Sequence, residues 1–139
     1  MTIDMAAFNR SLIDEFRATE GRPGGMVAGI DLILLTTTGA RTGRPHTTPL
    51  GYAVDGSPDR LVVYASNRGA ARHPAWFHNL VAHPEVRVER GSETFTARAR
   101  VAEGAERDHL LAVWFATSPA TADHQERAGR TIPVVLLER

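Results

Sequence analysis

Residues 85–101 read Glu-Val-Arg-Val-Glu-Arg-Gly-Ser-Glu-Thr-Phe-Thr-Ala-Arg-Ala-Arg-Val, and apolar and polar side chains alternate along both halves of this stretch. Such alternation is typical of β-strands that bury one face and expose the other. Gly91 and Ser92 interrupt the pattern in the middle, as a hairpin turn does. We therefore predict an antiparallel hairpin, with Glu and Arg side chains meeting across its exposed face.

Outward from this hairpin, the chain alternates further strands with helices. Period and turn signals predict helices over residues 3–18, 75–82 and 103–117, and strands over residues 31–38, 46–54, 60–66 and 131–137. Pro133, near the start of the last strand, favours an edge or bulge position for it. Because hairpins rather than βαβ crossovers connect the strands, we expect an α+β fold in which a mostly antiparallel sheet of about six strands curls into a barrel with helices around it.

Composition limits the classes of function. The 139 residues are expected to form one domain, residues 1–139, in which residues 1–25 are an N-terminal helix and loop. The absence of Cys excludes disulfides, thiol nucleophiles and iron–sulfur clusters. Sixteen basic and sixteen acidic residues balance, which disfavours a nucleic-acid partner. The sequence lacks an apolar run of the ~20 residues that span a bilayer, so we expect no stable membrane insertion.

Residues 36–48 form the first segment with possible chemistry. They combine six hydroxyl groups, two glycines and two arginines, Arg41 and Arg44, which have no acidic residue nearby in sequence. These are the components of an anion-binding loop, but an ordinary polar loop with solvated arginines has the same composition. Residues 66–74, with Arg68 and Arg72, precede a helix start and predict a second anion-binding position.

Motifs for other chemistries are missing from the sequence. There is no HExxH and the six His residues are not spaced as metal ligands, so we expect no metal site. GxSxG is also missing, which disfavours a serine hydrolase. An enzyme with this sequence would take its reactivity from a bound cofactor.

Three segments carry a family resemblance. They are Leu34-Leu35-Thr36-Thr37-Thr38-Gly39-x-Arg41-Thr42-Gly43-x-Pro45, followed by Pro49-Leu50; Ala65-Ser66-x-x-Gly69-x-x-x-x-Pro74-x-Trp76-x-x-Asn79-Leu80; and Arg130-Thr131-Ile132-Pro133-Val134-Val135. From about residue 30 to its end, the chain resembles the deazaflavin (F420)-dependent nitroreductase family, within the flavin and deazaflavin oxidoreductase superfamily. The resemblance implies a split β-barrel and coenzyme F420, a deazaflavin with a phosphodiester and an oligoglutamate tail.

Positions that match the family motifs imply a cofactor site. Its residues would be Arg41, Thr42, Arg44, His46, Thr48, Pro49, Leu50, Ser66, Asn67, Arg72, Ala75, Trp76 and Asn79. The arginines would hold the anionic groups, and the apolar residues would hold the flat ring. The resemblance also implies a substrate pocket at Gly51, Thr121 and His124, where a member of this family that activates nitroimidazole prodrugs has aromatic hydroxyls. Tyr52 and His124 are candidate proton donors.

The resulting hypothesis is an F420-dependent reductase that transfers a hydride to a small electron-poor acceptor, such as a quinone, an enone or a nitroarene. One alternative is an FMN-binding oxidoreductase in the same barrel, and another is a carrier that binds the cofactor or a fatty acid without catalysis. We expect a cytoplasmic monomer or homodimer, with peripheral association with the inner membrane as the alternative location.

Overall fold

A computed structural model describes residues 5–24 and 31–139, apart from the side chains of residues 5 and 68. Residues 3–4 of the first predicted helix lie outside this part of the chain. The helices are α1 (Met5–Ala18), α2 (Ala75–Ala82), α3 (Gly104–Thr117) and α4 (His124–Ala128), with short 3-10 turns η2 (Asn67–Gly69) and η3 (Pro119–Thr121). The strands are β1 (Leu32–Thr38), β2 (Pro45–Gly51), β3 (Ala53–Val54), β4 (Arg60–Tyr64), β5 (Glu85–Arg90), β6 (Glu93–Val101) and β7 (Val134–Glu138).

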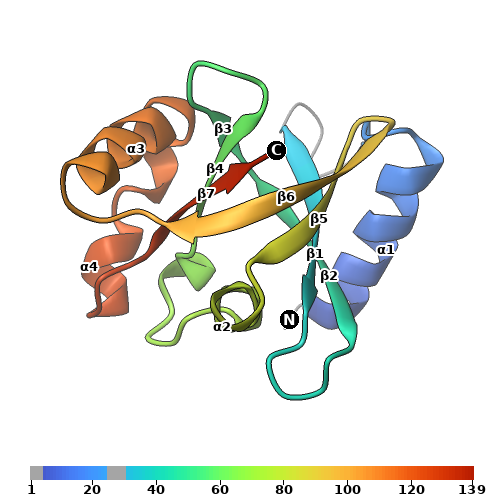
Figure 1. Cartoon of the computed structure of the whole chain (residues 1–139), viewed down its shortest axis with the longest axis horizontal. Helices are drawn as coiled ribbons and strands as arrows, with labels where there is room; N and C mark the ends of the chain where they lie inside the picture. Colours follow the sequence, from blue (N-terminus) through green and yellow to red (C-terminus); the bar gives the residue numbers. More distant parts are fainter. Residues whose placement is uncertain (1–4, 25–30) are drawn as a thin grey trace.

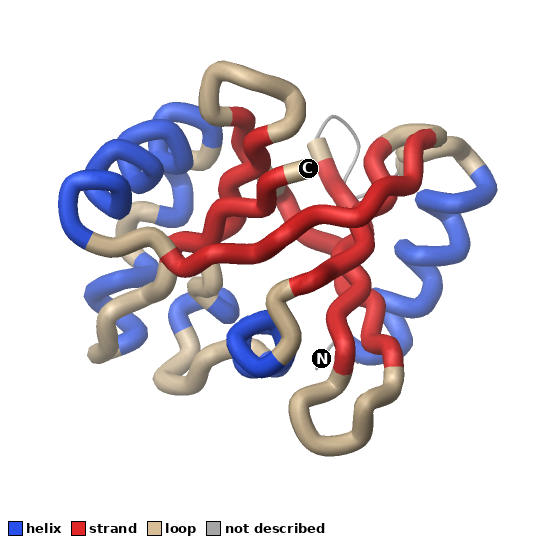
Figure 2. The backbone as a smooth tube through the Cα atoms, in the orientation of Figure 1, coloured by secondary structure: helices blue, strands red, loops and turns tan. Residues whose placement is uncertain are grey.

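The strands form one antiparallel sheet that curls round on itself (Figures 1 and 2). Its order is β2-β1-β5-β6-β7-β4-β3, so β2 and β3 stand at its two ends. Only Tyr52 separates these two strands in the chain. The predicted strand 46–54 is therefore a bent segment that joins the two ends of the sheet, and the bend explains why the described residues form seven strands rather than six.

The last strand is not at an edge, contrary to the prediction from Pro133. β7 pairs with β6 on one side and with β4 on the other. Pro133 lies just before the strand, and its carbonyl accepts a hydrogen bond from the Ala65 amide at 3.0 Å. The proline therefore interrupts no ladder bond, because the strand begins only after it.

Two layers of apolar side chains lie on the two faces of β4 and β7. Inside the barrel, Leu61, Val63, Val135 and Leu137 pack in one cluster. On the outer face, under α3, the alternate residues pack in a second cluster: Val62, Tyr64, Val134 and Leu136, with Leu110 and Trp114 of the helix. Burial on both faces explains why these strands read as continuous apolar runs.

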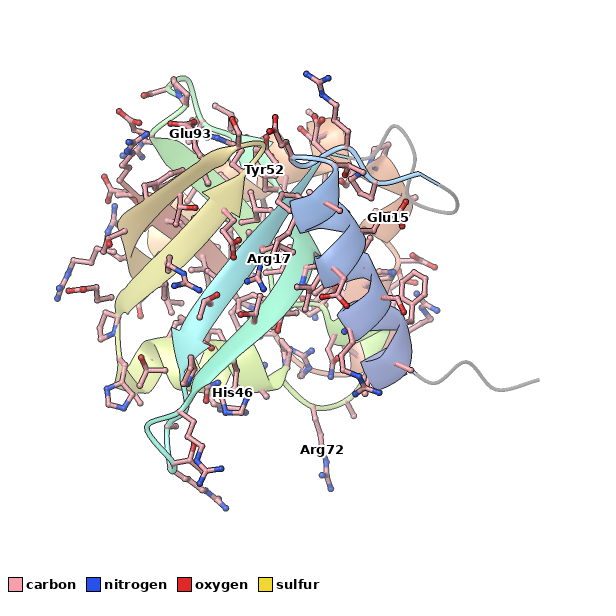
Figure 3. The ribbon with its side chains drawn as sticks, turned by 90° about the vertical axis from the view of Figure 1, so that its right-hand side faces the viewer. Glu15, Arg17, His46, Tyr52, Arg72 and Glu93 are labelled. Carbon is pink, nitrogen blue, oxygen red and sulfur yellow. The ribbon has the colours of Figure 1, made fainter. Side chains whose placement is uncertain are left out.

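The hairpin of β5 and β6 confirms the alternation, and Arg90 and Glu93 form a predicted Glu–Arg pair across it. Glu89 instead accepts two hydrogen bonds of 2.9 Å from Arg17 of α1. The α1 helix lies beside β2 (Figure 3) and buries Leu12 and Phe16. Among the described residues, no helix is long and apolar enough to cross a membrane.

Candidate functional site

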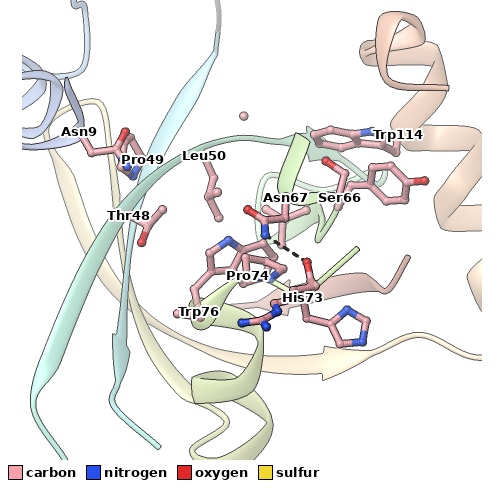
Figure 4. Close-up of a pocket in the computed structure, with 15 residues that line it drawn as sticks. Asn9, Thr48, Pro49, Leu50, Ser66, Asn67, His73, Pro74, Trp76 and Trp114 are labelled. Atoms are coloured by element: carbon pink, nitrogen blue, oxygen red, sulfur yellow. Dashed lines mark hydrogen bonds between the residues drawn. The ribbon is translucent and has the colours of Figure 1, made fainter. Parts of the chain in front are cut away.

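A cleft of about 570 Å³ opens beside the junction of β2 and β3 (Figure 4). One wall is formed by β2, a second by the loop from Ser66 to α2, and a third by Trp114 of α3. The lining residues are Asn9, Thr48, Pro49, Leu50, Gly51, Val63, Tyr64, Ser66, Asn67, Arg72, His73, Pro74, Ala75, Trp76 and Trp114. Eight of the predicted cofactor residues line this cleft: Thr48, Pro49, Leu50, Ser66, Asn67, Arg72, Ala75 and Trp76.

A second hollow of about 450 Å³ lies between the β1–β2 loop and α2. It is lined by Gly39, Ala40, Arg41, Thr42, His46, Ala75, His78 and Asn79. Ala75, the first residue of α2, lines both hollows, so the two adjoin the same residue. The remaining predicted residues Arg41, Thr42, His46 and Asn79 therefore lie beside the cleft, while Arg44 is exposed in the loop and lines neither hollow.

The buried side chain of Asn79 connects α2 to the β1–β2 loop. Its Nδ2 donates to the Thr37 hydroxyl at 3.1 Å, and its Oδ1 accepts from the Ala40 amide at 3.0 Å. Only 8% of Asn79 and 1% of Thr37 is exposed, so water cannot readily replace the contact between these two side chains. These two hydrogen bonds hold the β1–β2 loop and the end of β1 against α2.

The loop itself is a tight turn that depends on Gly39. Its amide donates to the Arg44 carbonyl at 2.8 Å, and its carbonyl accepts from the Gly43 amide at 2.9 Å. A Cβ at Gly39 would lie 2.5 Å from Thr42 Oγ1 and 3.0 Å from His46 Nε2, which leaves no room for a side chain. The turn therefore presents Arg41 and Thr42 on the same side as His46.

Positive charge dominates this end of the barrel. In the described part of the chain, Arg41, Arg44 and Arg72 form no ion pair, and all three are exposed. Figure 3 places Arg72 and His46 at the same end of the sheet. Guanidinium groups without carboxylate partners are available to bind phosphate or carboxylate groups of a ligand.

Arg130 holds the other loop of the cleft, and its role was not predicted from the sequence. Its guanidinium donates to the carbonyls of Ala65, Ser66 and Ala70 at 3.1–3.2 Å and contacts His73 Nδ1 at 2.7 Å. Burial lowers the pKa of His73, and the positive charge of Arg130 lowers it further. His73 is therefore neutral at neutral pH, with Nδ1 accepting from Arg130.

The structure does not bring the two candidate proton donors to the cleft. Tyr52 lines a different hollow with Asp31 and Arg90, and Figure 3 shows it at the opposite end of the sheet from His46 and Arg72. Burial raises the pKa of Tyr52, and the negative charge of Asp31 raises it further. His124 begins α4 with its Nδ1 buried and without a hydrogen-bond partner among the described residues, and it does not line the cleft.

Of the three predicted substrate-pocket residues, only Gly51 lines the cleft. Thr121 lies behind Trp114 and accepts a hydrogen bond of 2.9 Å from its indole Nε1. Trp114 and Tyr64 provide the aromatic wall that the sequence did not predict. Trp114 has the helical spacing of a core residue, and Tyr64 ends a buried strand, so sequence patterns do not distinguish either from ordinary core.

Comparison with known proteins identifies the family. The chain matches the profile of the F420H(2)-dependent quinone reductase family over residues 8–139. It is 38% identical over 129 residues to the F420H(2)-dependent quinone reductase Rv1261c of Mycobacterium tuberculosis, covering 89% of this chain and 85% of that protein.

Two solved structures have a similar fold. An F420-H2 dependent reductase shares 33% identity with a TM-score of 0.70, covering 78% of this chain and 94% of that chain. A protein described as a domain-swapped dimer shares 31% identity with a TM-score of 0.73, covering 97% and 98% of the two chains. The split β-barrel expected from the resemblance is thus confirmed, and this chain belongs to the F420H(2)-dependent quinone reductase family.

Proposed function

We propose that this protein is a single-domain reductase that binds reduced coenzyme F420 and reduces a quinone with it. The observation that carries the proposal is that two different hollows adjoin the same residue, Ala75. One is a cleft with apolar and aromatic walls, and the other lies under a loop with unpaired arginines. This combination fits a flat ring that continues into a polyanionic tail. When bound, reduced F420 supplies the hydride.

The chain's own residues would divide the binding as follows. Pro49, Leu50, Ala75 and Trp76 hold the ring by apolar contact, and Thr48, Ser66 and Asn67 supply polar groups at its edges. Arg41, Thr42, His46 and Arg72 hold the anionic groups, with Arg44 as a further positive charge in the loop. Asn79 contributes by holding the loop in place, because both of its polar atoms are engaged within the protein.

Exclusion of water and positioning of the acceptor are the protein's contribution to the reaction. The proton that accompanies the hydride comes from solvent in this proposal. Tyr52 is not assigned this task, since it lines another hollow and its pKa is raised. His124 is not assigned it either, because it does not line the cleft.

Cofactor choice is tested by equilibrium binding of F420 and of FMN to the wild-type protein at low and high salt. FMN has one phosphate, whereas F420 has a longer anionic tail that reaches more of the arginines. We expect tighter binding of F420 and a steeper decrease of its affinity with salt. Tighter binding of FMN would favour the FMN alternative and reject the proposal.

We further infer a cytoplasmic homodimer. The homodimer is supported by the 31% identical solved structure, which is described as a domain-swapped dimer. Light scattering of the purified protein measures the mass, for which we expect twice that of the 15.1 kDa chain. Cell fractionation tests the location, and recovery in the membrane fraction would favour peripheral association instead.

A further inference from the structure

At one end of the cleft the wall is the indole of Trp114, and Asn9 and Pro49 lie at the other end (Figure 4). Resting on the proposed function, we propose that the indole of Trp114 is the surface against which the planar ring of the acceptor stacks, and that Thr121 is a positioning residue that fixes the indole plane. The acceptor class is a flat, uncharged aromatic or quinonoid ring, of which menadione is a usable probe.

Trp114 is placed for contact with a ligand as well as for packing. It belongs to α3, yet it lines the cleft together with residues from β2 and β4. Its ring lies against Tyr64, with ring centroids 5.8 Å apart and planes inclined by 39°. Figure 4 shows Trp114 at the end of the cleft away from Asn9 and Pro49. Only 6% of Trp114 is exposed, and this part of the indole closes one end of the cleft.

The space beside the indole is left open by Gly51. A Cβ built at this glycine would lie 3.9 Å from Trp114 Cη2, an ordinary contact, so a larger side chain would extend into the space next to the indole. Gly51 lies in β2, opposite Leu32 of β1, and is not one of the glycines with positive φ. The backbone therefore does not require glycine here, and the missing side chain keeps this end of the cleft free for a ligand.

Thr121 fixes the orientation of the indole. Trp114 Nε1 donates to Thr121 Oγ1 at 2.9 Å, and the Thr121 hydroxyl donates to the Ser118 carbonyl at 2.8 Å. Both bonds lie in the α3–η3 turn behind the cleft. The hydroxyl is committed as acceptor to the indole and as donor to the backbone, so it acts through Trp114 rather than on the ligand.

The charges of the cleft support an uncharged ligand at this end. Residues that line the cleft include one permanently charged side chain, Arg72. His73, a second titratable residue, has a lowered pKa and is neutral at neutral pH. Gly51, Val63, Tyr64 and Trp114 line this end without a charged group, although little of each large side chain is exposed, and offset aromatic stacking favours a flat ring.

The first test compares steady-state reduction of menadione by F420H2 in Trp114→Leu, Trp114→Phe, Thr121→Val and Thr121→Ser, with Phe115→Leu as control. Phe115 is the neighbouring aromatic on α3, packs against Tyr64 and does not line the cleft. We expect Trp114→Leu and Thr121→Val to raise the KM for menadione about three- to tenfold at nearly unchanged affinity for F420. The KM of Trp114→Phe should lie between the values of these two variants and the wild type. The KM values of Thr121→Ser and Phe115→Leu should equal that of the wild type.

The second test measures binding without turnover. Protein saturated with oxidised F420 is titrated with menadione, and the indole N–H signals of the two tryptophans are followed by NMR, with Trp114→Phe to assign them. We expect the Trp114 signal to shift with saturation. A Trp114 signal that does not respond, or a KM that Thr121→Val leaves unchanged, overturns this inference. Failure of every variant and of the wild type to oxidise F420H2 would instead reject the proposed function, and the titration would still report on Trp114.

Discussion

Asn79 of α2 and Ala40 of the β1–β2 loop are joined by a hydrogen bond of 3.0 Å from the Ala40 amide to Asn79 Oδ1. The bond links the helix that lines the apolar cleft to the loop that carries Arg41. Since Ala75 begins the same helix and lines both hollows, the relative position of the two hollows depends on this contact.

Replacement of Asn79 by Ala is therefore expected to affect both stability and binding. The change leaves the buried Thr37 hydroxyl and the Ala40 amide without their partner, at a cost of about 1–3 kcal/mol in the free energy of unfolding. Affinity for F420 should decrease as well, because the loop is released. Urea denaturation measures the first effect and equilibrium titration the second. Val81→Ala, at an exposed position of the same helix, is the control and should change neither.

Arg41→Ala is expected to separate binding from stability. Arg41 is exposed and has no ion pair in the described part of the chain, so the unfolding free energy of the protein without cofactor should stay nearly constant. Loss of a charged donor to an anionic group should weaken F420 binding by about 1–3 kcal/mol, or about five- to 150-fold in Kd. Arg98→Ala, on the exposed face of β6, is the matched control. If Arg41→Ala unfolds the protein, Arg41 has a structural role and the loop assignment is wrong.

Arg130→Lys should disrupt the Ser66–His73 loop although the charge is kept. A lysine ammonium cannot reproduce the planar arrangement of donors that reaches three carbonyls and His73. We expect a loss of about 1–3 kcal/mol in the free energy of unfolding and weaker binding of the cofactor ring. Arg127→Lys, at an exposed arginine of α4, should behave as the wild type. Equal stability of Arg130→Lys and the wild type would contradict this role.

His73 should make the stability of the protein depend on pH below about 6.5. Its pKa is lower in the folded protein than in the unfolded chain, so the unfolded chain takes up the proton first as the pH falls. Stability should therefore be constant with respect to this group above about pH 6.5 and decrease below it. His73→Gln, which keeps an acceptor for Arg130, should have a smaller decrease between about pH 6.5 and 5. Denaturation curves at several pH values test this, and identical pH profiles of the two proteins would refute it.

Much of the fold follows from local patterns. The alternation of Val86, Val88, Phe95, Ala97 and Ala99 predicted the β5–β6 hairpin correctly, because period two reports directly which face is buried. The bend at Tyr52 was not predicted, since it arises from closure of the barrel rather than from a turn motif. The interior position of β7 also depends on long-range pairing, which the local signal of Pro133 does not report.

The candidate site was predictable where residues are contiguous in a family motif. Thr48, Pro49, Leu50, Ala75 and Trp76 line one cleft, in agreement with the resemblance. Trp114, Tyr64 and Arg130 were missed because each reaches the site from an element whose sequence pattern is that of core or surface. Tyr52 and His124 were proposed because their side chains can donate a proton. Residue type alone does not determine where a side chain points, and Tyr52 lies at a strand bend and His124 at a helix start.

Quinone reduction by this protein is tested by mixing F420H2 with menadione under anaerobic conditions, with and without the wild-type protein, and following the cofactor spectrum. We predict a protein-dependent reaction in which one menadione is reduced to menadiol for each F420H2 oxidised, saturating with menadione. A rate no faster than the reaction without protein, under conditions in which F420H2 is bound, would contradict the proposed reductase activity and favour a cofactor carrier.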